Sequence, residues 1–252
     1  MRSKRSNLLW VSPLERMRNE SWSIFREAGA SVLAYKLYPL GIATASIPVL
    51  PPLRSIPEKR VPVLFVHGFL HNASTFAYIK QKMRLAGWRD FRAVNLPTLR
   101  GTLPEMAEQT LDAITQMRRE FGSDQVDIVA HSMGGILARY ALQLLKADGQ
   151  VRKLVTLGTP HQGTVLSRYG YLPSLKELAP ESRTMRRLKR AQPLRHTQAV
   201  AVSGSLDVLM QPAELAHWEG VRNIRLRGVG HAGLLFSKRV VQIILAHLLP
   251  GK

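Results

Sequence analysis

Short apolar runs alternate with longer amphipathic stretches from residue 61 onward. Six of the runs are typical of buried strands, at residues 61–66, 91–96, 126–130, 153–157, 198–202 and 224–226. Helical patterns lie between and after them, at residues 74–86, 102–121, 136–147 and 237–249. Strands that alternate with helices form βαβ units. We therefore predict an α/β fold in which a mostly parallel central sheet is covered by helices on both faces.

One of these helices carries clear signals at both ends. Thr102 and Glu105 form a capping-box pattern at its start. Gly122 follows Phe121 at its end, and a glycine is the residue that most often terminates a helix. This predicts a helix that stops at Phe121.

The first sixty residues follow a different pattern. Residues 12–15 read as a helix start, with a serine cap, a proline and a glutamate. Residues 30–53 are mostly apolar and nearly long enough to cross a bilayer, but Lys36 and Pro39 interrupt them, which disfavours a transmembrane helix. We expect an N-terminal helical arm that packs on the main domain or lies on a membrane. A linker follows, marked by Pro48, Pro51, Pro52 and Pro57.

The chain therefore divides into an arm with its linker at residues 1–60 and an α/β domain at residues 61–252. Within the domain, residues 165–197 combine an apolar stripe with a strongly basic series of side chains. Such a segment is either a mobile lid or a surface helix packed on the core, and the sequence leaves both open.

A serine follows the third apolar run, at the point where a helix begins. Ser132 lies between the small residues Ala130 and Gly134, in the series Ala-His-Ser-Met-Gly. This is the form of a nucleophile elbow, a strained strand-to-helix turn that exposes a serine hydroxyl. A tight turn with an incidental serine is the plainer alternative. The strand before Ser132 and the helix after it favour the elbow.

A serine nucleophile needs a histidine base and a carboxylate that orients the base. In proteins with this elbow, the acid and then the histidine follow the serine along the chain. Asp207, just past the run 198–202, is our candidate for the acid, and Glu214 and Glu219 are its rivals. His231, in a glycine-rich loop after the last strand, is our candidate for the base.

The oxyanion of the tetrahedral intermediate needs two N–H donors. Met133 follows the serine at a helix N-terminus and is expected to supply one of them. Phe69 follows the first strand of the domain and is expected to supply the other, because Gly68 lets the backbone approach closely. An ordinary β-turn at Gly68 is the alternative. The substrate site is expected to include His67, Gly68, Leu70, His161 and Leu234.

Four stretches, at residues 66–69, 126–135, 157–164 and 228–237, resemble the bacterial lipases and esterases of the α/β-hydrolase fold. They look closest to small, compact lipases whose elbow is also Ala-His-Ser-Met-Gly. The resemblance covers residues 61 to about 249. It implies nucleophile, acid and base roles for Ser132, Asp207 and His231, and oxyanion donors at Phe69 and Met133. The arm and the long segment 165–197 depart from those lipases, which leaves the substrate range open.

Composition adds a partner to this picture. The chain has 36 Lys and Arg residues against 17 Asp and Glu, a formal net charge of +19, and no cysteine. The lack of cysteine excludes disulfides, a thiol nucleophile and a thiolate metal site. A basic surface attracts polyanions. Because no nucleic-acid-binding motif is present, we expect an anionic membrane surface rather than nucleic acid.

The sequence thus predicts a serine carboxylic-ester hydrolase that cleaves lipid or other apolar acyl esters through an acyl-enzyme, with no metal and no cofactor. An acyltransferase with the same triad and a non-catalytic membrane-binding protein of hydrolase fold are the alternatives. We expect the protein in a bacterial cell, membrane-associated at the periphery or cytoplasmic rather than secreted. The reason is that the charged region before the cleavage-like series at residues 43–45 is too long for a signal peptide.

Overall fold

The computed structural model describes residue 29 and residues 60–249, apart from 166, 168 and 169. The expected helix start at 12–15, the apolar stretch 30–53 and the proline linker lie outside the described residues. The α/β domain lies almost entirely inside them.

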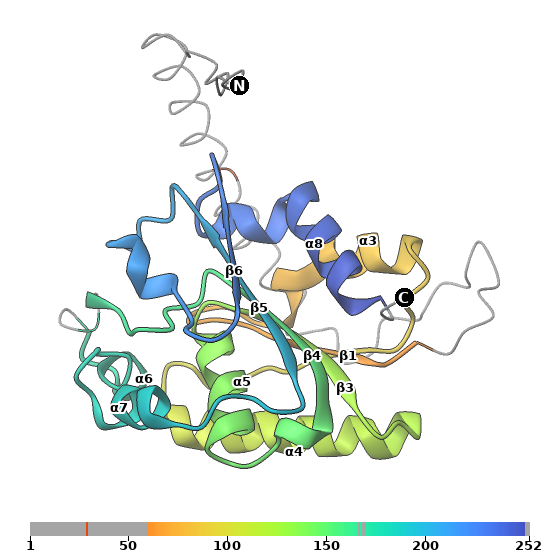
Figure 1. Ribbon diagram of the computed structural model, residues 1–252, viewed down its shortest axis with the longest axis horizontal. Coiled ribbons are helices and arrows are strands. Elements are labelled where there is room, and N and C mark those ends of the chain that lie inside the picture. Colours follow the sequence, from red (N-terminus) through yellow and green to blue (C-terminus); the bar gives the residue numbers. More distant parts are fainter. Residues whose placement is uncertain (1–28, 30–59, 166, 168–169, 250–252) are drawn as a thin grey trace, which may run out of the picture.

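The described residues form a six-stranded sheet in the order β2-β1-β3-β4-β5-β6, and every neighbouring pair is parallel (Figure 1). All six predicted strands are present, and the sheet is fully parallel where a mostly parallel one was expected. The strands are β1 Val63–Val66, β2 Phe91–Ala93, β3 Val126–His131, β4 Val151–Leu157, β5 Gln198–Gly204 and β6 Arg222–Leu226.

Helices cover both faces of the sheet, as the alternating pattern predicted (Figure 1). One face carries α4 Leu103–Phe121 and α5 Met133–Gln143, and the other carries α3 Ala77–Leu85 and α8 Lys238–Leu248. The described residues also form short 3-10 helices, at η1 Ala73–Phe76, η2 Asp148–Gln150, η4 Ala213–Ala216 and η5 Ala232–Phe236.

The strand side chains alternate between two separate cores. Leu64 and Val66 of β1 pack with α4 and α5, whereas Val63 and Phe65 pack with α3 and α8. This is the two-residue period of a strand, applied to a sheet buried on both faces. Every residue of β1 and β3 is buried, as expected for strands that are covered on both faces.

The helix ends follow local chemistry where that chemistry is strong. The Thr102 hydroxyl accepts from the Glu105 N–H, the Glu105 carboxylate accepts in return from the Thr102 N–H, and Gly122 ends α4 in the left-handed conformation. The predicted end at Phe121 is thus confirmed. The helix after the elbow ends at Gln143, short of the expected 147, and Lys146 has a positive φ of 63°.

The basic segment contains two short helices, α6 Pro173–Lys176 and α7 Arg183–Arg190. Met185 and Leu188 of α7 are buried in the same core as α5. The sequence left open a mobile lid or a surface helix packed on the core, and α7 is packed in this structure. Movement of this segment as a lid stays a prediction. The exposed face of α7 carries Arg183, Arg186, Arg187, Lys189 and Arg190.

Candidate active site

Ser132 forms the turn between β3 and α5 at the carboxyl edge of the sheet. Its backbone has φ 55° and ψ −127°, a strained combination for a residue with a side chain. Its N–H donates to the Leu157 carbonyl at 2.8 Å, and its carbonyl accepts from the Thr159 hydroxyl at 3.0 Å. These contacts hold the turn from the side of β4, so the strain is maintained by the neighbouring strand.

The small residue two positions after the serine is required by a close backbone approach. A Cβ added at Gly134 would lie 2.2 Å from the Val66 carbonyl oxygen, inside any permitted contact distance. The start of α5 therefore lies directly against the end of β1. This brings the loop that follows β1 beside Ser132.

The loop after β1 lies against the serine side chain. A Cβ at Gly68 would come within 2.7 Å of the Ser132 Cβ and 3.3 Å of its Oγ, so only glycine leaves this space open. Phe69, the predicted oxyanion donor, is the next residue. Among the described residues, neither the Phe69 nor the Met133 N–H donates to another backbone carbonyl. Phe69 follows Gly68 and Met133 follows Ser132. Because Gly68 lies against the Ser132 side chain, both predicted donors lie next in sequence to residues that are in contact.

The predicted acid and base are in direct contact. Nδ1 of His231 donates to Oδ2 of Asp207 at 2.7 Å, and the Asp207 side chain is fully buried. Oδ1 of Asp207 accepts the Leu209 N–H at 3.0 Å, which fixes the carboxylate. With its proton on Nδ1, His231 has Nε2 available as a base. The rival acids Glu214 and Glu219 are exposed.

Two further histidines lie in a row beside the base, and the sequence interpretation gave neither a role. The His131 ring lies 4.7 Å from the His231 ring, and the His71 ring lies 5.7 Å from that of His131. Burial is the main cause that lowers the pKa of His71 to about 4, and the neighbouring His231 and His67 contribute to the same lowering. Burial also lowers the pKa of His131 well below its usual value. Both rings are therefore neutral at pH 7.

His67, expected in the substrate site, has both ring nitrogens bonded within the protein. Nε2 accepts the Leu96 N–H at 2.9 Å, so Nδ1 carries the proton and donates to the Gly68 carbonyl at 2.9 Å. This ring joins the loop after β1 to the chain that follows β2. Its contacts therefore shape the walls of the site.

The other expected substrate residues lie in different surroundings. Leu70 is 39% exposed with φ 56°, and its N–H donates to the Thr98 hydroxyl. Leu234 is fully buried beside Gly158, where an added Cβ would also touch the Asp207 carboxylate and the His231 ring. His161 lies in a separate cavity with Arg139 and Trp218. The position of His161 after β4 predicted that it lies at the same edge of the sheet as Ser132. It did not predict the direction in which the His161 ring points.

The described residues contain no group of three or more His, Asp or Glu side chains placed to hold a metal ion. In the same part of the chain, no helix has the length and apolar character needed to span a membrane.

The fold and the elbow turn together define the class of protein. A parallel sheet in this order, with a strained serine turn after its central strand, is the α/β-hydrolase fold. The family model of the PGAP1-like alpha/beta domain matches residues 89–228, more than half of the chain. The chain belongs to this family.

The curated relatives that match the chain are longer proteins. A triacylglycerol lipase of Burkholderia plantarii is 28% identical over 138 residues, which are 49% of this chain and 36% of that protein. A provisionally named GPI inositol-deacylase C of Yarrowia lipolytica is 32% identical over 175 residues, 61% of this chain and 19% of that protein. The chain thus spans about a third or less of the length of these relatives.

Solved structures of lipases share the fold. The mature form of the Bacillus licheniformis lipase BlEst2 superimposes with a TM-score of 0.69 at 16% identity, over 80% of this chain and 97% of that one. Aspergillus fumigatus lipase B gives a TM-score of 0.64 at 20% identity, over 77% of this chain and 54% of that one. At these identities the likeness establishes the architecture alone.

Proposed function

We propose that this protein is a serine hydrolase of carboxylic esters. The observation that carries the proposal is the 2.7 Å hydrogen bond between His231 and the buried Asp207, at the same edge of the sheet as the strained turn of Ser132. A buried carboxylate on Nδ1 sets the tautomer in which Nε2 accepts a proton from a serine. Triacylglycerol lipases among the relatives support the same chemistry.

In this mechanism Ser132 Oγ attacks the ester carbonyl carbon while His231 Nε2 takes the hydroxyl proton. The N–H groups of Phe69 and Met133 hold the oxyanion of the tetrahedral intermediate. When the intermediate collapses, the ester C–O bond breaks and His231 returns the proton to the leaving alcohol. Water, deprotonated by His231, then attacks the acyl-enzyme and releases the carboxylic acid and the free serine.

The neutral histidines suit this chemistry. His231 becomes a cation during each half-reaction, with Asp207 as its counter-charge. Because the pKa values of His71 and His131 are lowered, neither ring carries a positive charge at pH 7 that would oppose the imidazolium.

The distribution of exposed apolar side chains supports a lipid substrate. Of the seven large hydrophobic side chains exposed in the described residues, five lie on loops that follow strands. The carboxyl ends of parallel strands meet at one edge of the sheet, which is the edge of Ser132. These five side chains offer an apolar surface to a fatty acyl ester: Leu70, Leu99, Val165, Tyr171 and Val208.

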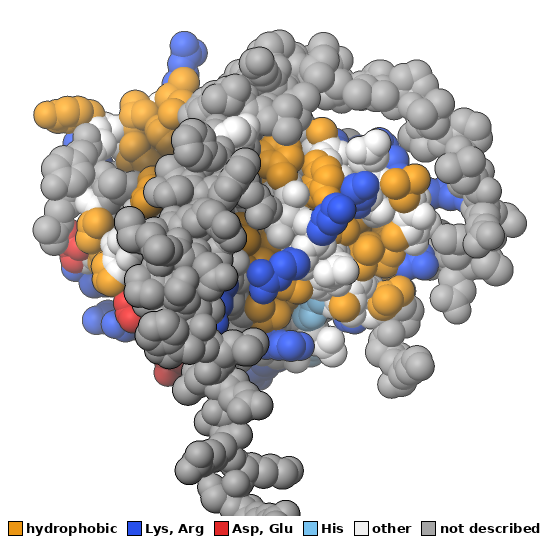
Figure 2. Space-filling view, turned by 90° about the horizontal axis from the view of Figure 1, so that it is seen from above, with side chains coloured by type: hydrophobic (Ala, Val, Ile, Leu, Met, Phe, Trp, Pro, Cys, Tyr) orange, Lys and Arg blue, Asp and Glu red, His pale blue; other side chains and the backbone are white. Residues whose placement is uncertain are grey.

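An anionic membrane is the partner that we propose. The chain has a net charge of +19, and α7 exposes a row of basic side chains that could contact an anionic surface. Figure 2 shows the molecule from above, with described Lys and Arg side chains scattered among apolar ones and few acidic side chains. Basic groups near an anionic surface each add about 1 kcal/mol of attraction.

The decisive test is hydrolysis of p-nitrophenyl esters across acyl chain lengths, together with labelling by a fluorophosphonate probe. We expect Ser132→Ala to lower turnover by about three decades or more and to abolish labelling. Ser123→Ala is the matched control, since that hydroxyl donates only to the Gln125 carbonyl. Wild-type activity in Ser132→Ala would refute the proposal. An acyltransferase would instead give acylated alcohol when a competing alcohol is present.

Liposome sedimentation tests the membrane separately. We expect binding to anionic vesicles and weak binding to neutral ones. Replacement of Arg183, Arg186 and Arg190 by Gln should reduce it, whereas Lys238→Gln on α8 should have a smaller effect. Equal binding to both kinds of vesicle would contradict an electrostatic attraction.

A further inference from the structure

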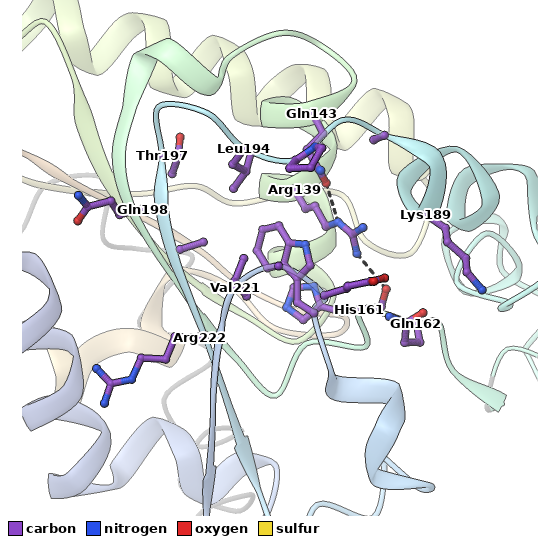
Figure 3. A pocket seen from close by; sticks show the side chains of 16 residues that line it. Arg139, Gln143, His161, Gln162, Lys189, Leu194, Thr197, Gln198, Val221 and Arg222 are labelled. Carbon is purple, nitrogen blue, oxygen red and sulfur yellow. Dashed lines mark hydrogen bonds between the residues drawn. The ribbon is translucent and has the colours of Figure 1, made fainter.

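A cavity of about 660 Å³ lies apart from the elbow, between α5, α7 and the starts of β5 and β6. Its volume is in the range of small-molecule sites. Ser132, Asp207 and His231 do not line it. Figure 3 shows Arg139 between Gln143 and His161, with Lys189 and Gln162 beyond it on the side of α7.

Arg139 is a buried cation whose partners are all neutral. Its side chain is 6% exposed, and it donates to the Gln143 side-chain oxygen, the His161 carbonyl and the Leu188 carbonyl at 2.7–3.0 Å. None of the ion pairs in the described residues involves it. A guanidinium has five N–H donors, so two remain beyond these three bonds. Burial lowers the pKa of Arg139 to about 10, which still leaves it charged at pH 7.

A second buried polar group lies beside this cation. His161 is 2% exposed, and its Nε2 pairs with the Thr156 hydroxyl at 3.0 Å. Its Nδ1 is buried and has no hydrogen-bond partner in the described part of the chain. Buried polar atoms are normally paired, so the cavity holds one unsatisfied nitrogen beside a cation that has no counter-charge among the described residues.

The cavity also has an aromatic wall. The Trp218 indole stacks on the His161 ring with 4.5 Å between centroids, and the Arg139 guanidinium lies 5.0 Å from the indole centroid. Among the charged residues that line the cavity, Lys189 and Arg222 accompany Arg139, and Glu219 is the single carboxylate. The cavity therefore combines an excess of positive charge with a flat apolar surface.

We propose that this cavity is a second binding site, for a small organic anion whose carboxylate or phosphate head pairs with Arg139 and whose apolar body lies against Trp218. The planar fork of a guanidinium matches both kinds of head, and a bound anion supplies the counter-charge that the described residues do not. This site does not depend on the proposed ester hydrolysis, because it uses none of the residues assigned to that reaction.

Isothermal titration of the full chain tests the proposal with four probes, three of which share a six-carbon chain. Hexanoate and hexyl phosphate carry the two candidate heads, hexan-1-ol carries the body alone, and inorganic phosphate carries the charge alone. We expect saturable binding of hexanoate, hexyl phosphate or both. The anion that binds more tightly shows whether the site prefers a carboxylate or a phosphate head. Hexan-1-ol and inorganic phosphate should each bind at least about tenfold more weakly. Binding of hexan-1-ol as tight as that of the anions, or no saturable binding of either anion, would overturn the proposal.

Variants then locate the binding. Arg139→Met should weaken anion affinity by about tenfold or more. Because Arg139 also ties α5 to α7, its exposed neighbour supplies a variant that keeps the fold: Lys189→Glu should weaken affinity about threefold. Lys238→Gln, on the opposite face of the sheet, should leave affinity unchanged. Trp218→Phe should remove the change in tryptophan fluorescence on binding. Unchanged affinity in both Arg139→Met and Lys189→Glu would place the anion elsewhere.

Discussion

His131 and His231 lie ring against ring, with 4.7 Å between their centroids, and Nε2 of His131 is 3.2 Å from the His231 carbonyl oxygen. The residue before the elbow serine thus contacts both the side chain and the backbone of the proposed base. Since the pKa of His131 is lowered by burial, its neutral ring uses the Nε2 proton to hold the loop of His231. The serine and its base are positioned through one shared neighbour.

We therefore expect His131→Phe to impair turnover more than substrate binding. Phenylalanine keeps a flat ring but loses the donor to the His231 carbonyl, so the base is less well placed. A misplacement of about 1 Å costs up to about a hundredfold in rate. Steady-state kinetics should show kcat lowered by about tenfold or more, with KM nearly unchanged. A raised KM at unchanged kcat would contradict a positioning role.

Acid should destabilise the protein through its buried histidines. The pKa of His71 is about 4 in the folded protein against about 6.5 when unfolded. Between these values the unfolded chain binds the extra proton, so the free energy of unfolding falls as pH drops from 6.5 to 4 and is fully retained above 6.5. For His71 the loss is on the order of 3 kcal/mol.

Urea unfolding at several pH values measures this effect. His71→Gln cannot take up the proton in the unfolded chain, so its stability should fall less steeply than that of the wild type between pH 6.5 and 4. Parallel pH profiles for the two proteins would show that another group causes the loss.

The parts of the fold that sequence predicted well have local causes. The end of α4 at Phe121 follows from Gly122, and its start follows from the reciprocal bonds of Thr102 and Glu105. The strands were predictable because a sheet covered on both faces needs apolar runs. Asp207 and His231 were expected to be neighbours because both follow parallel strands, whose ends share one edge.

Features set by distant residues were not predictable. The direction of the His161 ring depends on Trp218, 57 positions later, and on the Thr156 hydroxyl of β4. The sequence placed His161 at the correct edge of the sheet but gave no sign of the cavity with Arg139. The contact of His131 with the carbonyl of His231 joins residues 100 positions apart. No local pattern carries such packing.

The close approach of α5 to β1 predicts a strong effect at Gly134. An alanine Cβ there would lie 2.2 Å from the Val66 carbonyl oxygen and 2.6 Å from that of His67, both of which are backbone atoms. We expect Gly134→Ala to lower the free energy of unfolding by about 3 kcal/mol. Gly149→Ala is the control, because its added Cβ meets nothing within 4 Å, and it should change stability by less than about 0.5 kcal/mol. Similar losses in both variants would exclude a steric origin.

Strain at the elbow predicts that function is maintained at the expense of stability. Ser132 has φ 55° and ψ −127°, which glycine adopts without the Cβ penalty. Strain of this kind costs about 1–3 kcal/mol, which a glycine at this position would relieve. Glycine also makes the unfolded chain more flexible, which offsets about 0.5–1 kcal/mol of that gain. Ser132→Gly should therefore be more stable than Ser132→Ala by about 1 kcal/mol, or about 2–4 °C in Tm.

Both Ser132 variants should lack esterase activity, so the comparison separates strain from chemistry. Ser123 is the control position, because it is not among the positive-φ positions of the described residues. There the order should reverse, so that Ser123→Ala is more stable than Ser123→Gly. Calorimetric melting of the four variants measures both differences. If Ser132→Ala proves as stable as Ser132→Gly, the turn holds no strain that a serine side chain must overcome. The hydroxyl would then be presented without a cost to the fold.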